Sequence, residues 1–255
     1  MKLNHKVLGK DKSATPLMIL HGLFGSLDNW QTLGNAFAED RPVVLVDLRN
    51  HGRSPHAESH TYEDMVADVK ELVNGLTFDK FHLMGHSMGG KVAMHYALRN
   101  AADLEKLISV DMGTQTYERG HDEIFKALQT LDLSKIEKRS DADKALAAYI
   151  GEFGIRQFLL KGLKRSPQGY EWRMNLDVIY KDYPSILAGL PQNLGQFSEP
   201  TLFVKGQKSA YIKPDKIQDY QKWFPKADLR EIAGAGHWVH AEKPKDFFQS
   251  IQSFI

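Results

Sequence analysis

The sequence predicts an α/β protein with a doubly wound, mostly parallel sheet that is interrupted by a helical insertion. Within the first 112 residues, short apolar runs that end in polar or glycine-rich turns alternate with helical patterns. This alternation is typical of parallel strands connected by helices on both faces of a sheet. It stops near residue 113 and resumes near residue 196, and the residues in between carry helical patterns.

The strands of this sheet are expected at six short segments, most of them apolar runs. They cover residues 17–20, 43–46, 81–84, 107–110, 201–204 and 229–232. All are far shorter than the roughly 20 apolar residues that a membrane-spanning helix needs. The runs therefore predict buried strands and no membrane span.

Apolar residues at helical spacing predict helices between the strands. One covers residues 63–75, with Thr61 as its N-cap and Gly75 as its C-terminal stop. Others are expected directly after Ser87, near residues 216–224 and at the end of the chain. Inside the insertion, helices are expected over residues 123–131, 141–150 and 155–163, without a convincing strand.

These patterns divide the chain into two parts. Residues 1–112 and 196–255 are expected to form the α/β core, and residues 113–195 a helical cap. A long insertion in a compact domain usually serves as a functional lid, so we expect the cap to cover a binding site.

The composition excludes several classes of function. The 255 residues, 42% of them apolar, suffice for one substantial core. The net charge is +1, and the sequence has no basic stripe of the kind that nucleic-acid binding requires. The absence of cysteine excludes disulfides, thiolate catalysis and thiolate metal sites. A cysteine-free chain without a signal-like start favours a cytoplasmic location.

The strongest chemical motif lies at residues 85–89, which read Gly-His-Ser-Met-Gly between a strand and a helix. This pattern and context are those of a nucleophile elbow, a turn so sharp that the positions two residues before and two residues after the serine are glycines. It aims the hydroxyl of Ser87 at the open end of the sheet, where the N-terminus of the next helix favours developing negative charge. We therefore expect Ser87 to be a nucleophile.

A nucleotide-binding interpretation competes for the same residues. Residues 85–91 also match the first seven positions of a phosphate-binding P-loop, and Asp111 could serve as its magnesium-side carboxylate. The next position is Val92, which has no hydroxyl for magnesium. We keep nucleotide binding only as the alternative from another class of function.

Two further segments supply the partners that a nucleophilic serine needs. The residues His21-Gly22-Leu23 follow the first predicted strand, where folds with such an elbow place an oxyanion donor. We expect the N–H groups of Leu23 and Met88 to form the oxyanion hole. His237 follows the last strand, where the general base belongs, and its spacing from His240 is more typical of an ordered loop than of a metal site.

The catalytic acid is expected at Asp111, directly after the strand that neighbours the nucleophile's own strand. The strand over residues 201–204 runs into a loop with Ser209 at the position where many proteins of this topology carry the acid. The carboxyl ends of neighbouring parallel strands face one crevice, so Asp111 is placed to hold His237. Asp177 or another cap carboxylate is the alternative.

In these motifs the sequence resembles the α/β-hydrolase superfamily, and the resemblance covers nearly its whole length. More closely it is similar to the bacterial YbfF-type esterases and the related mitochondrial abhydrolase-domain esterases. The matching stretches are residues 21–26, 47–52, 85–91, 121–125 and 234–242. The resemblance implies hydrolysis of carboxylic esters or acyl thioesters without a metal or organic cofactor.

The expected partner is a small-molecule acyl ester or an acyl-CoA-like thioester with a short- to medium-chain acyl group under the cap. Carbon–carbon bond hydrolases and a lyase use the same serine, acid and histidine on this scaffold, so these reactions stay open as alternatives. Candidate substrate contacts are Phe24, Arg119, His121, Trp172 and Trp238. The sequence gives no indication of the oligomeric state.

Overall fold

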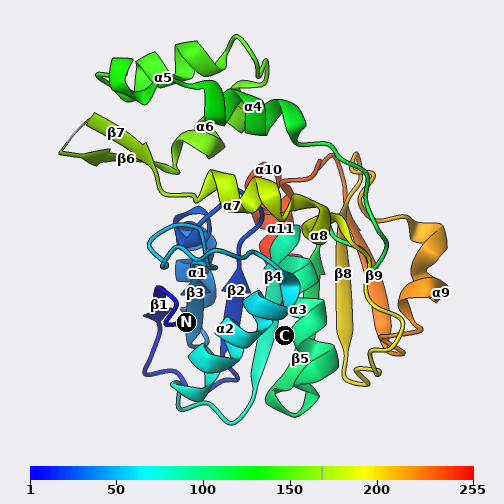
Figure 1. The fold of residues 1–255 in the computed structure, drawn as a ribbon. Helices are drawn as coiled ribbons and strands as arrows, with labels where there is room; N and C mark the ends of the chain where they lie inside the picture. The colour runs from blue at the N-terminus through cyan, green and yellow to red at the C-terminus, as the bar shows by residue number, and fades with distance from the viewer. Residues whose placement is uncertain (168) are drawn as a thin grey trace.

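The computed structural model describes residues 1–167 and 169–255. Its centre is a seven-stranded sheet in the order β1-β3-β2-β4-β5-β8-β9 (Figure 1). Neighbouring strands run parallel, except that β1 pairs antiparallel with β3. The strands are β1 (His5–Leu8), β2 (Leu17–Leu20), β3 (Val43–Val46), β4 (Phe81–His86), β5 (Leu104–Val110), β8 (Thr201–Gly206) and β9 (Ala227–Ile232). The predicted fold class is confirmed.

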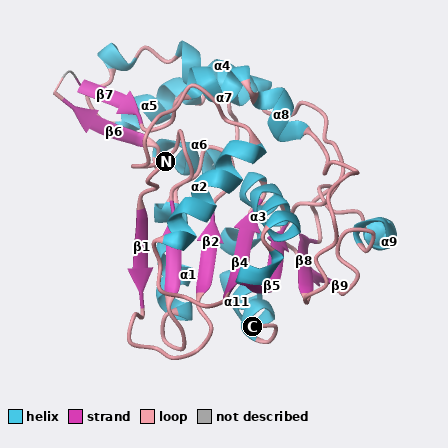
Figure 2. Cartoon of the chain, turned by 60° about the horizontal axis from the view of Figure 1, so that its bottom comes forward, coloured by secondary structure: helices cyan, strands magenta, loops and turns pink. Residues whose placement is uncertain are grey.

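Helices cover both faces of the sheet, as Figure 2 shows. One face packs against α2 (Tyr62–Asn74), α3 (Met88–Arg99) and α9 (Ile217–Tyr220), and the other against α1 (Gln31–Phe37) and α11 (Pro244–Gln252). Alternate residues of β2 join the two resulting cores: Met18 belongs to the first and Ile19 to the second. This two-residue period explains why the central strands are continuous apolar runs.

Local signals account for where the main helices begin and end. The hydroxyl of Thr61 accepts a hydrogen bond from the N–H of Asp64, and α2 ends at Gly75, as the sequence predicts. The helix expected over residues 216–224 is shorter. A single 3-10 turn, η4 (Pro214–Lys216), leads into α9, and Pro225 disfavours helical geometry at Phe224.

The insertion lies above the carboxyl edge of the sheet in Figure 1. It contains α4 (Asp122–Thr130), α5 (Arg139–Leu146), α6 (Phe153–Leu160), α7 (Leu176–Lys181) and α8 (Tyr183–Leu187). It also contains the antiparallel strands β6 (Leu163–Ser166) and β7 (Gly169–Trp172), which correct the expectation of helices without strands. These strands are short and mostly half-exposed, so they lack the apolar runs that mark the core strands.

The remaining elements are short. They are the 3-10 helices η1 (Leu27–Trp30), η2 (Ala101–Asp103) and η3 (Leu133–Lys135), and the one-turn helix α10 (Val239–Glu242). Sequence analysis missed β1, an edge strand whose residues are half-exposed or exposed. No helix of residues 1–167 and 169–255 is long and apolar enough to cross a membrane.

Candidate active site

Ser87 occupies a strained turn between β4 and α3. Its backbone angles are φ 52° and ψ −122°, a conformation that non-glycine residues rarely adopt. A Cβ atom at Gly85 would lie 2.0 Å from the carbonyl oxygen of Gly89, and one at Gly89 would lie 2.5 Å from that of His21. The turn therefore requires both glycines. It is held by a 3.0 Å hydrogen bond from the Ser87 N–H to the Val110 carbonyl.

Asp111 and His237 form a hydrogen-bonded pair from two distant parts of the chain. Asp111 directly follows β5, and its side chain is fully buried. Its Oδ2 accepts a 2.7 Å hydrogen bond from Nδ1 of His237. Because a carboxylate can only accept, Nδ1 carries the proton and Nε2 is left as a base.

Further contacts fix both members of the pair. The backbone N–H of Gly206 donates to Oδ1 of Asp111 over 3.1 Å, and the hydroxyl of Ser209 donates to Oδ2. The ring of Tyr211 stacks on His237 with a centroid distance of 4.1 Å. The imidazole therefore has its tautomer set by Asp111 and its plane set by Tyr211.

Ser87 and His237 face one cavity, which both side chains line. No hydrogen bond among the described residues joins them. Such nucleophile–base pairs are often long before the substrate binds and tighten in the reacting complex. The arrangement can deprotonate a hydroxyl and stabilise the imidazolium that results.

The loop after β2 comes close to the serine. A Cβ atom at Gly22 would lie 3.1 Å from Cβ of Ser87. The next residue, Leu23, lines two cavities together with Ser87, and Met88 lines the smaller of them. Among the described residues, the N–H groups of Leu23 and Met88 have no hydrogen-bond acceptor. Two unpaired donors beside a serine suit an oxyanion.

Two buried histidines hold this loop in place. His21 has Nδ1 2.8 Å from the carbonyl oxygen of Gly22, and its Nε2 accepts from the N–H of Leu48. His51 accepts a 3.2 Å hydrogen bond from the N–H of Phe24 on Nε2. Phe24 has a positive φ of 62°, so the contact supports a turn that would otherwise be unfavourable. The sequence pointed to residues 47–52 only as a stretch of resemblance and did not indicate this role of His51.

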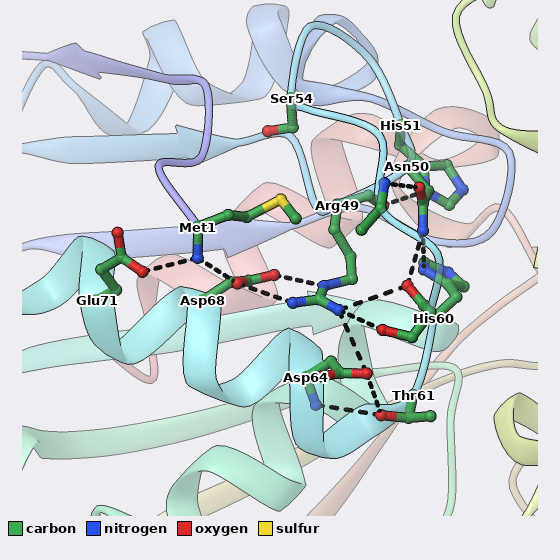
Figure 3. Close-up of polar contacts among 12 residues, drawn as sticks. Met1, Arg49, Asn50, His51, Ser54, His60, Thr61, Asp64, Asp68 and Glu71 are labelled. Atoms are coloured by element: carbon green, nitrogen blue, oxygen red, sulfur yellow. Dashed lines mark hydrogen bonds and ion pairs between the residues drawn. The ribbon is translucent and has the colours of Figure 1, made fainter. Parts of the chain in front are cut away.

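His51 belongs to the loop that follows β3. Its neighbours in that loop contact α2 and the insertion, as Figure 3 shows for the α2 side. Arg49 donates two hydrogen bonds to Asp68 of α2, of 2.6 and 3.0 Å. The carbonyl oxygen of Asn50 accepts a 3.0 Å hydrogen bond from the N–H of Asn175, which precedes α7. The loop after β3 therefore contacts the loop after β2, helix α2 and the insertion.

Burial keeps most histidines around the site neutral. Desolvation lowers the pKa of His21 to about 4 and that of His51 to about 3. The pKa of His86, which lies beside His237, is also lowered well below its usual value by burial. Neutral rings can accept backbone hydrogen bonds, which imidazolium cannot do. The loop contacts described above depend on this state.

Two cavities meet at Ser87. The first has a volume of about 100 Å³ and is lined by residues that include Met88, Met112, Tyr117 and Ile186. The second has a volume of about 200 Å³ and is lined by residues that include His237 and Phe158 of α6. Both receive side chains from the core and from the insertion.

The candidate substrate contacts divide into two groups. Phe24, His121 and Trp238 line the second cavity. Among the described side chains, Arg119 and Trp172 line neither cavity at Ser87. Arg119 is exposed and pairs with Asp122, and the indole N–H of Trp172 donates to the Leu128 carbonyl within the insertion.

The structure disfavours the nucleotide alternative. The ammonium of Lys91, which would bind phosphate, donates instead to the carbonyl oxygens of Gln115 and Ala188, each over 2.7 Å. Burial lowers the pKa of Lys91 to about 7. The side chain thus contacts both ends of the insertion.

His240 stacks on Trp30, and no cluster of three or more potential metal ligands occurs in residues 1–167 and 169–255.

Comparison with known proteins agrees with this geometry. A family model described as the alpha/beta hydrolase fold matches residues 15–244. The sn-1-specific diacylglycerol lipase ABHD11 of Danio rerio is 37% identical over all of this chain and 83% of its own length. Esterase YbfF of Escherichia coli is 35% identical over all of this chain and 99% of its own. A solved structure described as a marine microorganism esterase is 38% identical, with a TM-score of 0.96 over 100% of this chain and 99% of that one. The chain therefore belongs to the α/β-hydrolase fold family.

Proposed function

We propose that this protein is a serine esterase in which Ser87, His237 and Asp111 form the catalytic triad. His237 takes the proton of the Ser87 hydroxyl, and Oγ attacks the acyl carbonyl carbon. The N–H groups of Leu23 and Met88 donate to the oxyanion that forms. The leaving alcohol departs with the proton from His237, and water activated by the same imidazole releases the acid from the acyl-enzyme.

The observation that carries this proposal is the hydrogen bond from His237 to Asp111, together with the cavity that His237 and Ser87 both line. It gives the histidine the tautomer that a general base needs. The names of the relatives point the same way, because they describe a diacylglycerol lipase and esterases. Acyl thioesters react by the same attack, and we include them in the proposal.

We further propose that residues 113–195 act as a cap over the acyl group. Tyr117, His121 and Ile186 of this segment line the cavity at Ser87. A short- to medium-chain acyl group would lie beneath them, and no cofactor enters the scheme. We place the enzyme in the cytoplasm, which fractionation of cells that express the tagged chain tests.

The test is hydrolysis of p-nitrophenyl butyrate by wild type and by Ser87→Ala. We expect the variant to fold and to lose activity by a factor on the order of 10³ or more in kcat. An acyl-CoA and a carbon–carbon ring-cleavage substrate belong in the same screen. Turnover of the ring-cleavage substrate alone, or more than a tenth of wild-type ester turnover in Ser87→Ala, would refute the proposal.

A further inference from the structure

The two cavities at Ser87 differ in one chemically decisive neighbour. Both are lined by Ser87 and Leu23, but His237 lines only the cavity of about 200 Å³. Met88, an oxyanion donor in the proposed function, lines only the cavity of about 100 Å³. An ester bound at Ser87 therefore has one side next to the base and one side away from it.

The proton that His237 carries decides which half of the ester lies on which side. As the Oγ–carbon bond forms, the Ser87 proton moves to Nε2 of His237. As the carbon–oxygen bond to the alcohol breaks, that proton moves to the alcohol oxygen. The leaving oxygen must then lie within hydrogen-bond reach of His237. The acyl chain leaves the carbonyl carbon on the opposite side.

We propose that the cavity of about 100 Å³ binds the acyl group and that the cavity beside His237 binds the leaving group. The assignment rests on the proposed serine esterase mechanism and extends it to substrate class. The preferred substrate is then an ester or thioester with a short acyl group and a much larger, mainly apolar leaving group.

Size supports a short acyl group. A cavity of about 150 Å³ accommodates one benzene molecule, so about 100 Å³ suits an acyl chain of roughly four carbons. Its walls are well held. The hydroxyl of Tyr117 donates to the Tyr211 carbonyl over 2.8 Å and accepts from the Gly113 N–H over 2.7 Å. The Tyr117 N–H donates to the Leu187 carbonyl, and Lys91 holds the backbone on either side.

The leaving-group side has room to continue outward. Ile155, Phe158 and Trp238 line the second cavity and also a third cavity of about 450 Å³. The rings of Phe158 and Trp238 lie 5.9 Å apart, centroid to centroid, on this shared wall. The third cavity is bordered by exposed residues such as Gln157 and Glu242. A long leaving group can therefore pass these rings toward solvent.

A matched pair of isomeric esters tests the assignment. Octyl acetate and ethyl octanoate have the same atoms and similar alkyl alcohols as leaving groups, but the long chain lies on opposite sides of the carbonyl. We expect kcat/KM for octyl acetate to exceed that for ethyl octanoate by about ten-fold or more. Equal values, or a preference for ethyl octanoate, would overturn the assignment.

Two variants separate the sides, because deacylation involves the acyl group alone. Leu187→Phe narrows the acyl cavity and should slow turnover of butyryl esters more than of acetyl esters. The deacylation rate, measured after the burst with p-nitrophenyl esters, should fall in the same order. Phe158→Ala should change the ratio of octyl to ethyl acetate kcat/KM and leave the deacylation rate of the acetyl-enzyme unchanged. If Phe158→Ala slowed deacylation instead, and Leu187→Phe changed only the ratio of octyl to ethyl acetate, the two sides would be exchanged.

The outcome also distinguishes this inference from the proposed function. A protein that cleaves p-nitrophenyl acetate through Ser87 but prefers the long acyl isomer contradicts the cavity assignment alone. A protein without Ser87-dependent turnover of any ester contradicts the proposed function itself. Should Leu187→Phe fold poorly, Ile186→Ala supplies the converse test, because a larger acyl cavity should raise activity on ethyl octanoate.

Discussion

Replacing Asp111 by asparagine exchanges one oxygen of the proposed triad for an amide nitrogen and adds no backbone strain. Asp111 has a positive φ of 49°, and asparagine tolerates this conformation as well as aspartate does. The carboxylate accepts hydrogen bonds from Nδ1 of His237 and from the N–H of Gly206 on different oxygens. An amide offers only one accepting oxygen, so one of these two contacts must be lost.

Both orientations of the amide are unfavourable. If its nitrogen faces His237, Nδ1 must give up its proton, and Nε2 then carries the proton and cannot act as a base. If its nitrogen faces Gly206, two donors meet in a fully buried site, at a cost of about 1–3 kcal/mol in stability. In either case the imidazolium loses its negative partner. We expect kcat to fall by roughly 10³ to 10⁴, which is about 4–5.5 kcal/mol of transition-state stabilisation.

The assay is steady-state hydrolysis of p-nitrophenyl butyrate, with thermal unfolding measured on the same samples. Ser209→Ala is the matched control, because its hydroxyl donates to the same carboxylate without setting the tautomer of His237. We expect this control to lose about ten-fold or less. Activity of Asp111→Asn within a few-fold of wild type, with a collapse in Asp177→Asn instead, would show that the acid lies in the insertion.

Three further predictions concern the surroundings of the triad. Lys91→Met removes the ammonium that donates to carbonyls at both ends of the insertion, so limited proteolysis should cut residues 113–195 faster than in wild type. His51→Phe removes the acceptor of the Phe24 N–H, and we expect kcat to fall by about ten-fold or more with little change in KM. Burial lowers the pKa of His21 to about 4 and those of His95 and His240 to about 3 in the folded protein, below the usual value of 6.5. The unfolded chain therefore binds more protons below pH 6.5, and the free energy of unfolding should fall as the pH drops from about 6.5 to about 3. For each such histidine the slope is at most about 1.4 kcal/mol per pH unit, and urea unfolding across this range measures it; a flat profile would contradict the neutral state of His21, His95 and His240.

The sequence predicted the fold where burial leaves a simple pattern. Central strands such as β2 are buried on both faces and appear as unbroken apolar runs. The edge strand β1 and the hairpin β6–β7 are half-exposed, so neither apolar runs nor regular alternation marks them. Phe224 looked like the end of a longer helix, but the following proline and its burial against Phe203 override the helical pattern.

The site was predictable to the extent that it follows from strand order. Asp111 and the serine follow neighbouring parallel strands, so their proximity could be inferred, although the triad roles stay a prediction. Contacts that depend on the path of loops could not be inferred from the sequence. The acceptor role of His51 toward Phe24 spans 27 residues, and nothing in the local sequence indicates it. The indole N–H of Trp172 donates to the Leu128 carbonyl, and Trp172 does not line the cavities at Ser87. The sequence did not indicate the hairpin that positions Trp172, so this orientation could not be predicted.

The central claim is that Ser87 forms the covalent acyl-enzyme with His237 as its base. A fluorophosphonate reacts with an activated serine, and mass spectrometry of the intact protein and of its peptides locates the adduct. We predict one adduct per chain in wild type, placed on Ser87, none in Ser87→Ala, and much slower labelling in His237→Gln. Labelling of another residue, or undiminished labelling of Ser87→Ala, would contradict the account.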